Sequence, residues 1–262
     1  MDIIVLIKQV PDTTDVMIDK KTGNLIREGI PTIINPDDVH ALEEALRLKE
    51  LLGGKVTAIS MGPPQAIDAL QEAIAMGIEA GILLTDEAFA GADTLATAYT
   101  LGRCIEKIGR YDLIICGHQA IDGDTAQVGP QVAEYLNIPQ ITYVRDIQIH
   151  RNKLVAEQII EDGFEKIESR IPSLVTVMKE MNKPRYPTID RIIDACGDDA
   201  NIKIWNAGDI GAPVDRIGLK GSPTQVKQVY TPEHKRKGET LSGSKGSIAQ
   251  ALFDRLKGKN LF

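Results

Sequence analysis

The chain has 262 residues, of which 43% are hydrophobic and 26% charged, and its formal net charge is −7. This length is enough for one large domain with a substantial core, alone or with an appended arm, and the composition is ordinary for a globular protein. The acidic balance argues against nucleic acid as a partner, because a phosphodiester backbone binds to basic surfaces. No apolar run approaches the roughly 20 residues that cross a bilayer, so we expect no membrane partner.

The first residues and the cysteines predict a cytoplasmic protein. Residues 1–5 carry neither a positively charged segment nor a cleavage site, so they predict a strand rather than a signal peptide. Cys104, Cys116 and Cys196 are far apart and have no Cys-x-x-Cys spacing, which fits a reducing compartment and gives no support for an iron–sulfur cluster or a zinc site. Any redox chemistry would have to come from an organic cofactor.

Strands and helices alternate through the first half of the chain. Residues 3–7 predict a buried strand, and residues 16–34 predict a β-hairpin excursion from the main sheet. A helix then begins at Pro36, with Asn35 as its cap, and stops at Gly53. Further strands are predicted at 55–61, 80–85 and 111–116, and further helices at 63–76, 93–108 and 124–136. This alternation predicts an α/β fold, in which helices cover both faces of a parallel sheet.

The second half of the chain changes character. Three segments have strand patterns, at residues 141–149, 154–160 and 165–177. The two prolines of residues 180–187 predict an exposed loop, and a short helix is predicted at 188–196. A polar linker at 232–247 leads to a final amphipathic helix formed by Ile248, Leu252, Phe253 and Leu256. We therefore expect a main domain at 1–204 and a C-terminal arm at 205–262.

The stretch 117–129 is the candidate ligand site. In open α/β sheets ligands bind beyond the carboxyl ends of the strands, and a strand, a Gly-rich turn and a helix start leave backbone N–H groups free for a phosphate. The carboxylates of Asp122 and Asp124 would repel phosphate directly. We therefore expect the amides around Gly123, Thr125 and Gln127 to bind the anion while an aspartate caps the following helix. A tight turn without a ligand is an equally good interpretation of these residues alone.

Two other helix starts are secondary candidates. Residues 35–38 chiefly predict capping, which is compatible with backbone contacts to an adenine or a flavin. Asp93 caps a helix in the same way, with ligand contact as a second possibility. The histidines are isolated and no Ser or Cys has a base near it in the sequence, so we predict no catalytic residue. His118 alone lies in the candidate site, either as a donor to flavin or phosphate or as a structural side chain.

Several motifs together resemble the beta subunit of electron-transfer flavoproteins. They are Lys8-Gln9-Val10-Pro11, Asn35-Pro36 followed by Ala41-Leu42-Glu43-Glu44-Ala45, Met61-Gly62-Pro63, Gln119-Ala120-Ile121-Asp122, and Asn182-x-Pro184-Arg185-Tyr186. The resemblance covers almost the whole chain in order, and residues 119–143 are its most specific part. It implies a doubly wound α/β fold of the adenine-nucleotide-binding type, with a C-terminal arm that wraps the alpha subunit of a heterodimer.

The resemblance also implies a ligand. In this family the alpha subunit holds an FAD, and the beta subunit binds either AMP, as a structural ligand, or a second FAD. The helix start at Asp93 and Thr94 is included with the contacts that the resemblance implies. The full set of expected cofactor contacts is Leu6, Asn35, Pro36, Asp37, Asp38, Met61, Asp93, Thr94, Gly117, His118, Gln119, Ala120, Ile121, Asp122, Gly123, Asp124, Thr125, Ala126, Gln127 and Val128.

The choice between FAD and AMP rests on Gly123, Thr125, Ala126 and Val128. AMP-type members carry larger side chains in this stretch, whereas the residues here resemble the flavin-bifurcating branch of anaerobes. In that branch NADH gives a hydride to the beta-subunit FAD. One electron then passes to ferredoxin or flavodoxin, and the other passes through the alpha-subunit FAD to a flavin dehydrogenase of the acyl-CoA or 2-hydroxy acid class. At position 118 the family commonly has Arg or Lys, which carry a permanent positive charge. This chain has His118, whose charge depends on pH.

Met181, Asn182 and Pro184 fall where the family presents an apolar anchor to its dehydrogenase. An exposed Met on such a loop would suit a transient partner, and a Met181 turned inward is an equally good interpretation. Two rival functions remain: a conventional electron carrier with AMP in the beta site, and a nucleotide-binding regulatory module of the universal-stress-protein kind. The resemblance leaves open whether the chain is an electron carrier or a subunit of an NADH-dependent oxidoreductase.

Overall fold

The structure is a computed structural model that describes residues 1–12, 31–151, 153–197, 200–227 and 238–259. The chain forms two compact units, Met1–Val226 and Lys227–Phe262. The boundary predicted at 204/205 falls inside the first unit, because residues 205–226 bond to the rest of it. The carbonyl of Trp205 accepts from the N–H of Thr85, and the N–H of Leu219 donates to the carbonyl of Ala90. The arm therefore begins later than the sequence predicts.

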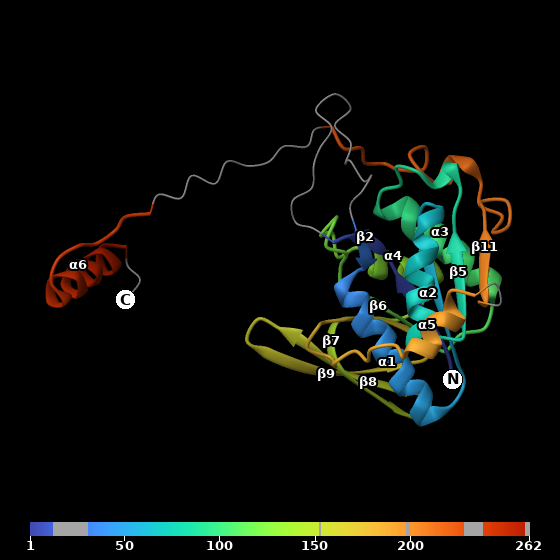
Figure 1. Ribbon diagram of the computed structural model, residues 1–262, viewed down its shortest axis with the longest axis horizontal. Helices are drawn as coiled ribbons and strands as arrows, with labels where there is room; N and C mark the ends of the chain where they lie inside the picture. Colours follow the sequence, from blue (N-terminus) through green and yellow to red (C-terminus); the bar gives the residue numbers. More distant parts are fainter. Residues whose placement is uncertain (13–30, 152, 198–199, 228–237, 260–262) are drawn as a thin grey trace. The chain divides into compact units, whose positions relative to one another are not determined.

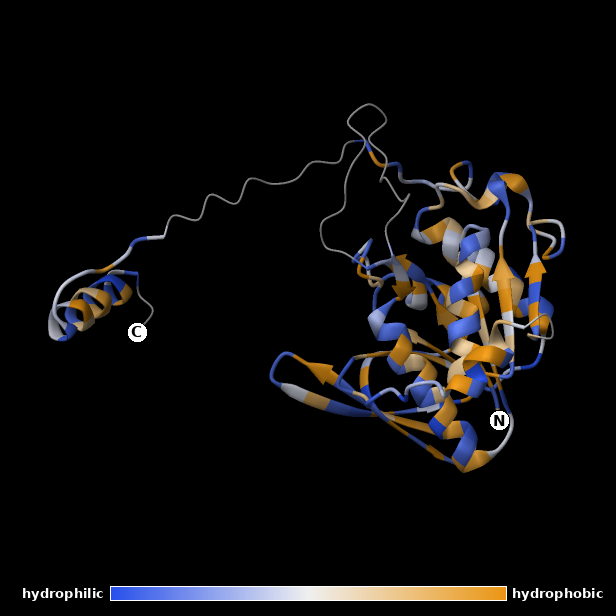
Figure 2. Cartoon of the chain, viewed as in Figure 1, coloured by the Kyte–Doolittle hydropathy of each residue, from blue (hydrophilic) through white to orange (hydrophobic). Residues whose placement is uncertain are grey.

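One nine-stranded sheet forms the centre of the first unit (Figure 1). Its order is β11 (Ile202–Trp205), β5 (Ala80–Leu84), β4 (Lys55–Met61), β1 (Asp2–Ile7), β6 (Leu113–Gly117), β10 (Ser173–Val177), β7 (Gln140–His150), β8 (Lys153–Ile160) and β9 (Gly163–Arg170). The pairs from β11 to β7 are parallel, whereas β8 and β9 extend the sheet as antiparallel strands. β1 and β6 are buried along almost their whole length, which explains their continuous apolar sequences (Figure 2).

Helices cover both faces of the parallel part, as predicted. Residues of α1 (Pro36–Leu52) and α2 (Ile67–Met76) share one core cluster with alternate residues of β1 and β4. Residues of α3 (Thr94–Ile108) and α4 (Val128–Leu136) share the cluster on the other face. α5 (Ile189–Ala195) packs against α2. Three short 3-10 helices are η1 (Pro64–Ala66), η2 (Glu87–Phe89) and η3 (Val214–Arg216).

Several elements differ from the prediction. The expected hairpin at 16–34 lies mostly in residues 13–30, outside the described residues; at its edges, β2 (Gln9–Pro11) and β3 (Thr32–Ile34) form an antiparallel pair. The strand expected at 165–177 is divided, because β9 ends before Pro172 and β10 begins after it. β11 was not expected, since four residues at the edge of a sheet leave little pattern in the sequence.

The described residues of the second unit contain α6 (Lys245–Gly258), which matches the expected amphipathic helix. The Ser244 side chain accepts a hydrogen bond from the N–H of Ser247 and caps its start. The expected linker at 232–247 lies partly outside the described residues, and residues 238–244 form neither helix nor strand.

Candidate functional site

The strand order reverses between β1 and β6. From β1 the chain crosses to β4 and β5 on one side, and it then returns to β6 on the other side. The parallel register brings the carboxyl ends of these four strands to one edge, as the sequence predicts. Ligands of open α/β sheets bind at such a reversal, and the loop that leaves β6 here is the predicted stretch 117–129.

Asp38 connects the two strands at this reversal. Its carboxylate accepts hydrogen bonds from the N–H of Lys8, just after β1, at 2.8 Å and from the N–H of Gly117, at the end of β6, at 3.0 Å. The side chain belongs to the first turn of α1, and the residue is only 6% exposed. Burial raises the pKa of the Asp38 carboxyl to about 7, although the hydrogen bonds from Lys8 and Gly117 act to lower it.

Asn35 occupies the N-cap position of α1 but does not cap it. The expected side-chain bond to the helix is absent among the described residues. Instead, the side-chain amide nitrogen donates to the carbonyl of Gln119 at 2.8 Å, and its oxygen accepts from the N–H of Ile121 at 3.0 Å. Asn35 is fully buried, and Pro36 begins the helix without needing a donor. The prediction that Asn35 acts as a side-chain cap is therefore wrong, because its amide reaches across to the loop after β6.

This loop is longer than the sequence predicts. α4 begins at Val128 rather than at 124, and the residue at its N-cap is Gln127, whose side chain makes no capping bond. Asp124 and Ala126 have φ values of 47° and 52°, so neither can belong to a right-handed helix. The expected cap by an aspartate is wrong for the same reason. We call residues 117–127 the β6–α4 loop.

The second half of the β6–α4 loop and the first residue of α4 have free N–H groups. Within the described part of the chain, the N–H groups of Thr125, Ala126, Gln127 and Val128 donate to no protein acceptor. The N–H of Gly123, by contrast, already donates to the carbonyl of Ala120 at 3.2 Å, which corrects the expectation that it binds the anion. The free N–H groups lie next to the positive end of the α4 dipole, an arrangement that suits a phosphate group.

Neighbouring groups contact the acidic residues in and beside the loop. Lys8 Nζ lies 2.7 Å from Asp122 Oδ1, and the side-chain amide of Gln119 donates to Asp124 at 3.0 Å. His118 Nδ1 lies 2.7 Å from Asp37 Oδ2, but the ring N–H is not aligned for a hydrogen bond, so this contact is an ion pair only when the ring is protonated. Lys8 is absent from the predicted site residues, although a lysine directly after the first strand was a signal for it.

The remaining predicted contacts lie around the same edge. Leu6 and Met61 are near the ends of β1 and β4 and face the α3 and α4 side of the sheet. Asp93 caps α3 through the N–H of Ala96, as predicted, and also accepts from the hydroxyl of Thr224 at 2.7 Å. The Thr94 hydroxyl donates to the Gln127 side chain at 3.1 Å, so this helix start touches the β6–α4 loop.

Loop 180–187 is fastened to α1. Met181 is 9% exposed and belongs to the core cluster beneath α1, so the inward alternative is the correct one. Asn182 donates to the carbonyl of His40 at 3.0 Å. Arg185 forms ion pairs with Glu43, at 2.8 Å, and with Glu50, at 2.5 Å. Pro184 is half-buried between these anchors.

Exposed apolar side chains lie at the end of this loop and on α5. Tyr186 is 94% exposed, and Ile189 and Ile193 of α5 are 76% and 65% exposed. They are absent from the predicted site residues, although the short helix predicted at 188–196 has more isoleucines than it can bury on one face. A surface of this kind is a common feature of protein–protein contacts.

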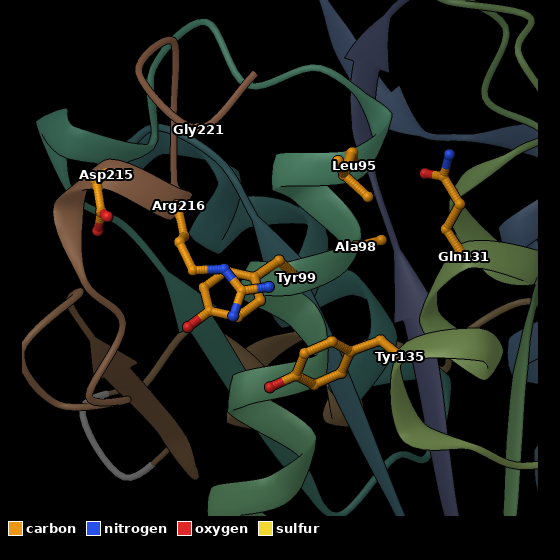
Figure 3. Close-up of a pocket in the computed structure, with 8 residues that line it drawn as sticks. All are labelled: Leu95, Ala98, Tyr99, Gln131, Tyr135, Asp215, Arg216 and Gly221. Carbon is orange, nitrogen blue, oxygen red and sulfur yellow. The ribbon is translucent and has the colours of Figure 1, made fainter. Parts of the chain in front are cut away.

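A separate cavity of about 140 Å³ lies between α3, α4 and the segment around η3 (Figure 3). The guanidinium of Arg216 stacks on the ring of Tyr99 at 4.0 Å, and Tyr135 meets the same ring edge-on with centroids 5.4 Å apart. The first contact joins the segment around η3 to α3, and the second joins α4 to α3. The residues that line the cavity contribute none of the free N–H groups described above.

Two further expectations concern metals and membranes. Among the described residues, no group of three or more His, Cys, Asp or Glu side chains is placed to hold a metal ion. None of the described helices has the length and apolar character that a bilayer span requires.

Comparison with known proteins shows similarity along the whole chain. The electron transfer flavoprotein domain matches residues 22–203. The electron transfer flavoprotein subunit beta of Thermoanaerobacterium thermosaccharolyticum is 55% identical over 261 residues, covering 100% of each chain. The caffeyl-CoA reductase-Etf complex subunit CarD of Acetobacterium woodii is 48% identical over 263 residues, again covering 100% of each. The acryloyl-CoA reductase electron transfer subunit gamma of Anaerotignum propionicum is 41% identical over 266 residues, with the same coverage.

Proposed function

The chain belongs to the electron transfer flavoprotein family as a beta subunit, and on that premise we propose that its β6–α4 loop holds the diphosphate of an FAD. The observation that supports FAD is the combination of free N–H groups at Thr125 to Val128 with open space beside Gly123. A Cβ atom added at Gly123 would meet nothing within 4 Å. The small side chains of Thr125 and Ala126 leave further room next to these amides. We expect a diphosphate to use more of these N–H groups than a single phosphate would.

The residues of this chain bind and orient the cofactor rather than react with it. Lys8 and the free N–H groups supply positive charge at the loop, while Asp122 and Asp124 are held by Lys8 and Gln119. Bound flavin supplies the chemistry that exchanges a hydride for single electrons. His118 lies beside Asp37, with its Nδ1 2.7 Å from Asp37 Oδ2, at the edge of this loop.

We propose that the heterodimer passes electrons from NADH to ferredoxin or flavodoxin and, through the alpha-subunit FAD, to a flavin dehydrogenase. Two relatives carry names that place them with reductases of CoA thioesters, caffeyl-CoA and acryloyl-CoA. An acyl-CoA dehydrogenase is therefore the favoured partner class, with the 2-hydroxy acid class as the alternative.

The dehydrogenase would dock on Tyr186, Ile189 and Ile193 rather than on Met181. These three side chains are exposed on or next to α5, whereas Met181 is part of the core. Asn182 and Pro184 would act indirectly, because they fix the loop that carries Tyr186. The C-terminal arm with α6 would bind the alpha subunit through the apolar side chains of Ile248, Leu252 and Leu256.

The test is to purify the chain with its alpha subunit, denature the heterodimer and identify the released nucleotides. We expect two FAD molecules per heterodimer. One FAD and one AMP would instead establish the conventional electron carrier. Steady-state kinetics would then examine the electron path: NADH oxidation should require both ferredoxin and the dehydrogenase with its acyl-CoA substrate, and NADH oxidation with the dehydrogenase alone would contradict bifurcation.

A further inference from the structure

Two buried side chains of α1 hold the β6–α4 loop by its backbone. Each carboxylate oxygen of Asp38 accepts one backbone N–H, from Gly117 and from Lys8. Each polar atom of the Asn35 side chain also makes one backbone bond, to Gln119 and to Ile121. Asn35 is fully buried and Asp38 is 6% exposed, so neither side chain faces an open binding surface.

We propose, on the premise that the β6–α4 loop binds a nucleotide, that Asn35 and Asp38 are positioning residues that order this loop before the nucleotide arrives. Their side chains do not touch the ligand. This role differs from the direct contact that the family resemblance implies for positions 35 and 38. It concerns the conformation of the loop and holds equally for FAD and for AMP.

The backbone of the loop explains why such positioning is needed. Asp124 and Ala126 have positive φ values, which cost free energy for residues other than glycine. Ordering a free loop on binding would also take entropy from the binding free energy. Because the loop is already ordered at Gly117, Gln119 and Ile121, less conformational entropy is lost when the nucleotide binds. The free N–H groups of its second half are then presented in one arrangement.

The fit around Gly117 indicates how closely α1 and β6 are joined. A Cβ atom added at Gly117 would lie 2.5 Å from Asp38 Oδ1 and 2.9 Å from the backbone of Asp37. The helix start therefore approaches the end of β6 as closely as a glycine allows. This contact places Asp38 under the loop, where its carboxylate reaches both strand ends.

Asp37 provides a control on the same helical turn. Its carboxylate lies beside His118, and among the described residues it accepts no backbone N–H. At pH 8, above the pKa of about 7 of Asp38, Asp37→Asn and Asp38→Asn each remove a negative charge from adjacent positions. If the charge alone mattered, both variants would bind an anionic ligand more tightly. If positioning matters, Asp38→Asn weakens binding, because the new amide NH₂ would face a backbone N–H and one of the two bonds would be lost.

The experiment uses the heterodimer after removal of nucleotide, with AMP and FAD as the two probes. Dissociation constants come from calorimetry, and hydrogen exchange reports on amides 117–127 in the nucleotide-free protein. We expect Asp38→Asn to raise the dissociation constant at least tenfold and to speed exchange at Gly117 and Ile121. Asp37→Asn should leave exchange at Gly117 and Ile121 unchanged, because the Asp37 carboxylate accepts no backbone N–H among the described residues. Equal weakening in both variants, or unchanged exchange in Asp38→Asn, overturns the proposal.

Asn35→Ala keeps the test decisive if Asp38→Asn fails to fold. The Asn35 side chain makes no capping bond, so alanine removes its two bonds to the loop together with its interaction with the Asp38 carboxyl. We expect faster exchange at Ile121 and weaker binding, with the absorption spectrum of bound FAD unchanged at saturation. An altered spectrum would mean that Asn35 touches the flavin, and normal exchange would mean that it does not hold the loop. If the natural heterodimer binds neither AMP nor FAD, the proposed function itself fails.

Discussion

Helix α1 holds two loops, and it holds them by different means. At its N-terminus, the buried side chains of Asn35 and Asp38 bind the β6–α4 loop through hydrogen bonds to its backbone. Further along, Glu43 and Glu50 bind loop 180–187 through the guanidinium of Arg185, which is about one third exposed at 31%. The first attachment depends on the shape and protonation of buried groups. The second depends on charge that salt and solvent can screen.

The difference fits the proposed roles of the two loops. A loop that carries a cofactor must keep one backbone arrangement, and buried bonds to four backbone groups enforce it. A loop next to a docking surface must accept partners and release them. Partly exposed ion pairs hold the backbone near Arg185, while Tyr186 stays free to meet another protein. The strength of the attachment at Asn35 and Asp38 should therefore depend on packing and pH. The strength of the attachment through Arg185 should depend on the salt concentration.

Gly117→Ala tests the buried attachment with the largest expected effect. The new Cβ would overlap Asp38 Oδ1 and the backbone of Asp37, so we expect a loss of about 3 kcal/mol in the free energy of unfolding together with loss of bound nucleotide. Chemical denaturation and nucleotide content measure the two effects. Gly123→Ala is the matched control, because its Cβ meets open space and its stability should change by less than about 0.5 kcal/mol. Normal stability in Gly117→Ala would show that α1 and β6 are not tightly joined.

A pH titration tests the same attachment through Asp38. Burial raises its pKa from 3.8 in the unfolded chain to about 7 in the folded one. The folded state therefore binds more protons between these values, and the stability that Asp38 contributes is full below pH 4 and falls as the pH rises to 7. Between pH 5 and 8 the free energy of unfolding should fall by about 3 kcal/mol more in the natural chain than in Asp38→Asn. Parallel pH curves for the two proteins would contradict the raised pKa.

Met181→Ala separates core packing from docking on the second loop. Because Met181 is buried under α1, we expect a loss of about 2 kcal/mol in the free energy of unfolding. Ile189→Ala is the control: its side chain is 76% exposed, so stability should change by less than about 0.5 kcal/mol while electron delivery to the dehydrogenase weakens. If Met181→Ala were as stable as the natural chain and lost electron delivery, Met181 would be the anchor after all.

Local patterns in the sequence predict much of this fold. The bounds of α1 and α3 and the cap at Asp93 follow from hydrophobic spacing and from polar residues at helix starts, which act within a few residues. The alternation of strands and helices predicts the doubly wound sheet, and the carboxyl ends of its strands predict the edge at which the site lies.

Contacts between distant segments account for the errors. Asn35 has the sequence context of a cap, yet its partners are Gln119 and Ile121, which no local pattern connects to it. The start of α4 was misplaced because the positive φ values at Asp124 and Ala126 suit glycine, and neither residue is glycine. The burial of Met181 depends on α1, which is far away in the sequence.

Arg185→Lys distinguishes the two attachments by their response to salt. Lysine keeps the charge but cannot bind Glu43 and Glu50 at once with a planar group, so we expect a loss of about 1 kcal/mol after allowance for solvent exposure. The loss should shrink in 1 M NaCl, measured by denaturation in urea, because salt weakens the natural ion pairs. Arg47→Lys is the control. The Arg47 side chain is half-exposed, and its ion pair with Glu44 joins two residues of the same helix. The weaker nucleotide binding of Asp38→Asn, relative to the natural protein in the same salt, should persist, because its lost bonds come from a buried side chain and go to the backbone. If salt erased both deficits equally, charge rather than buried geometry would hold the nucleotide loop, and the contrast between the two ends of α1 would be wrong.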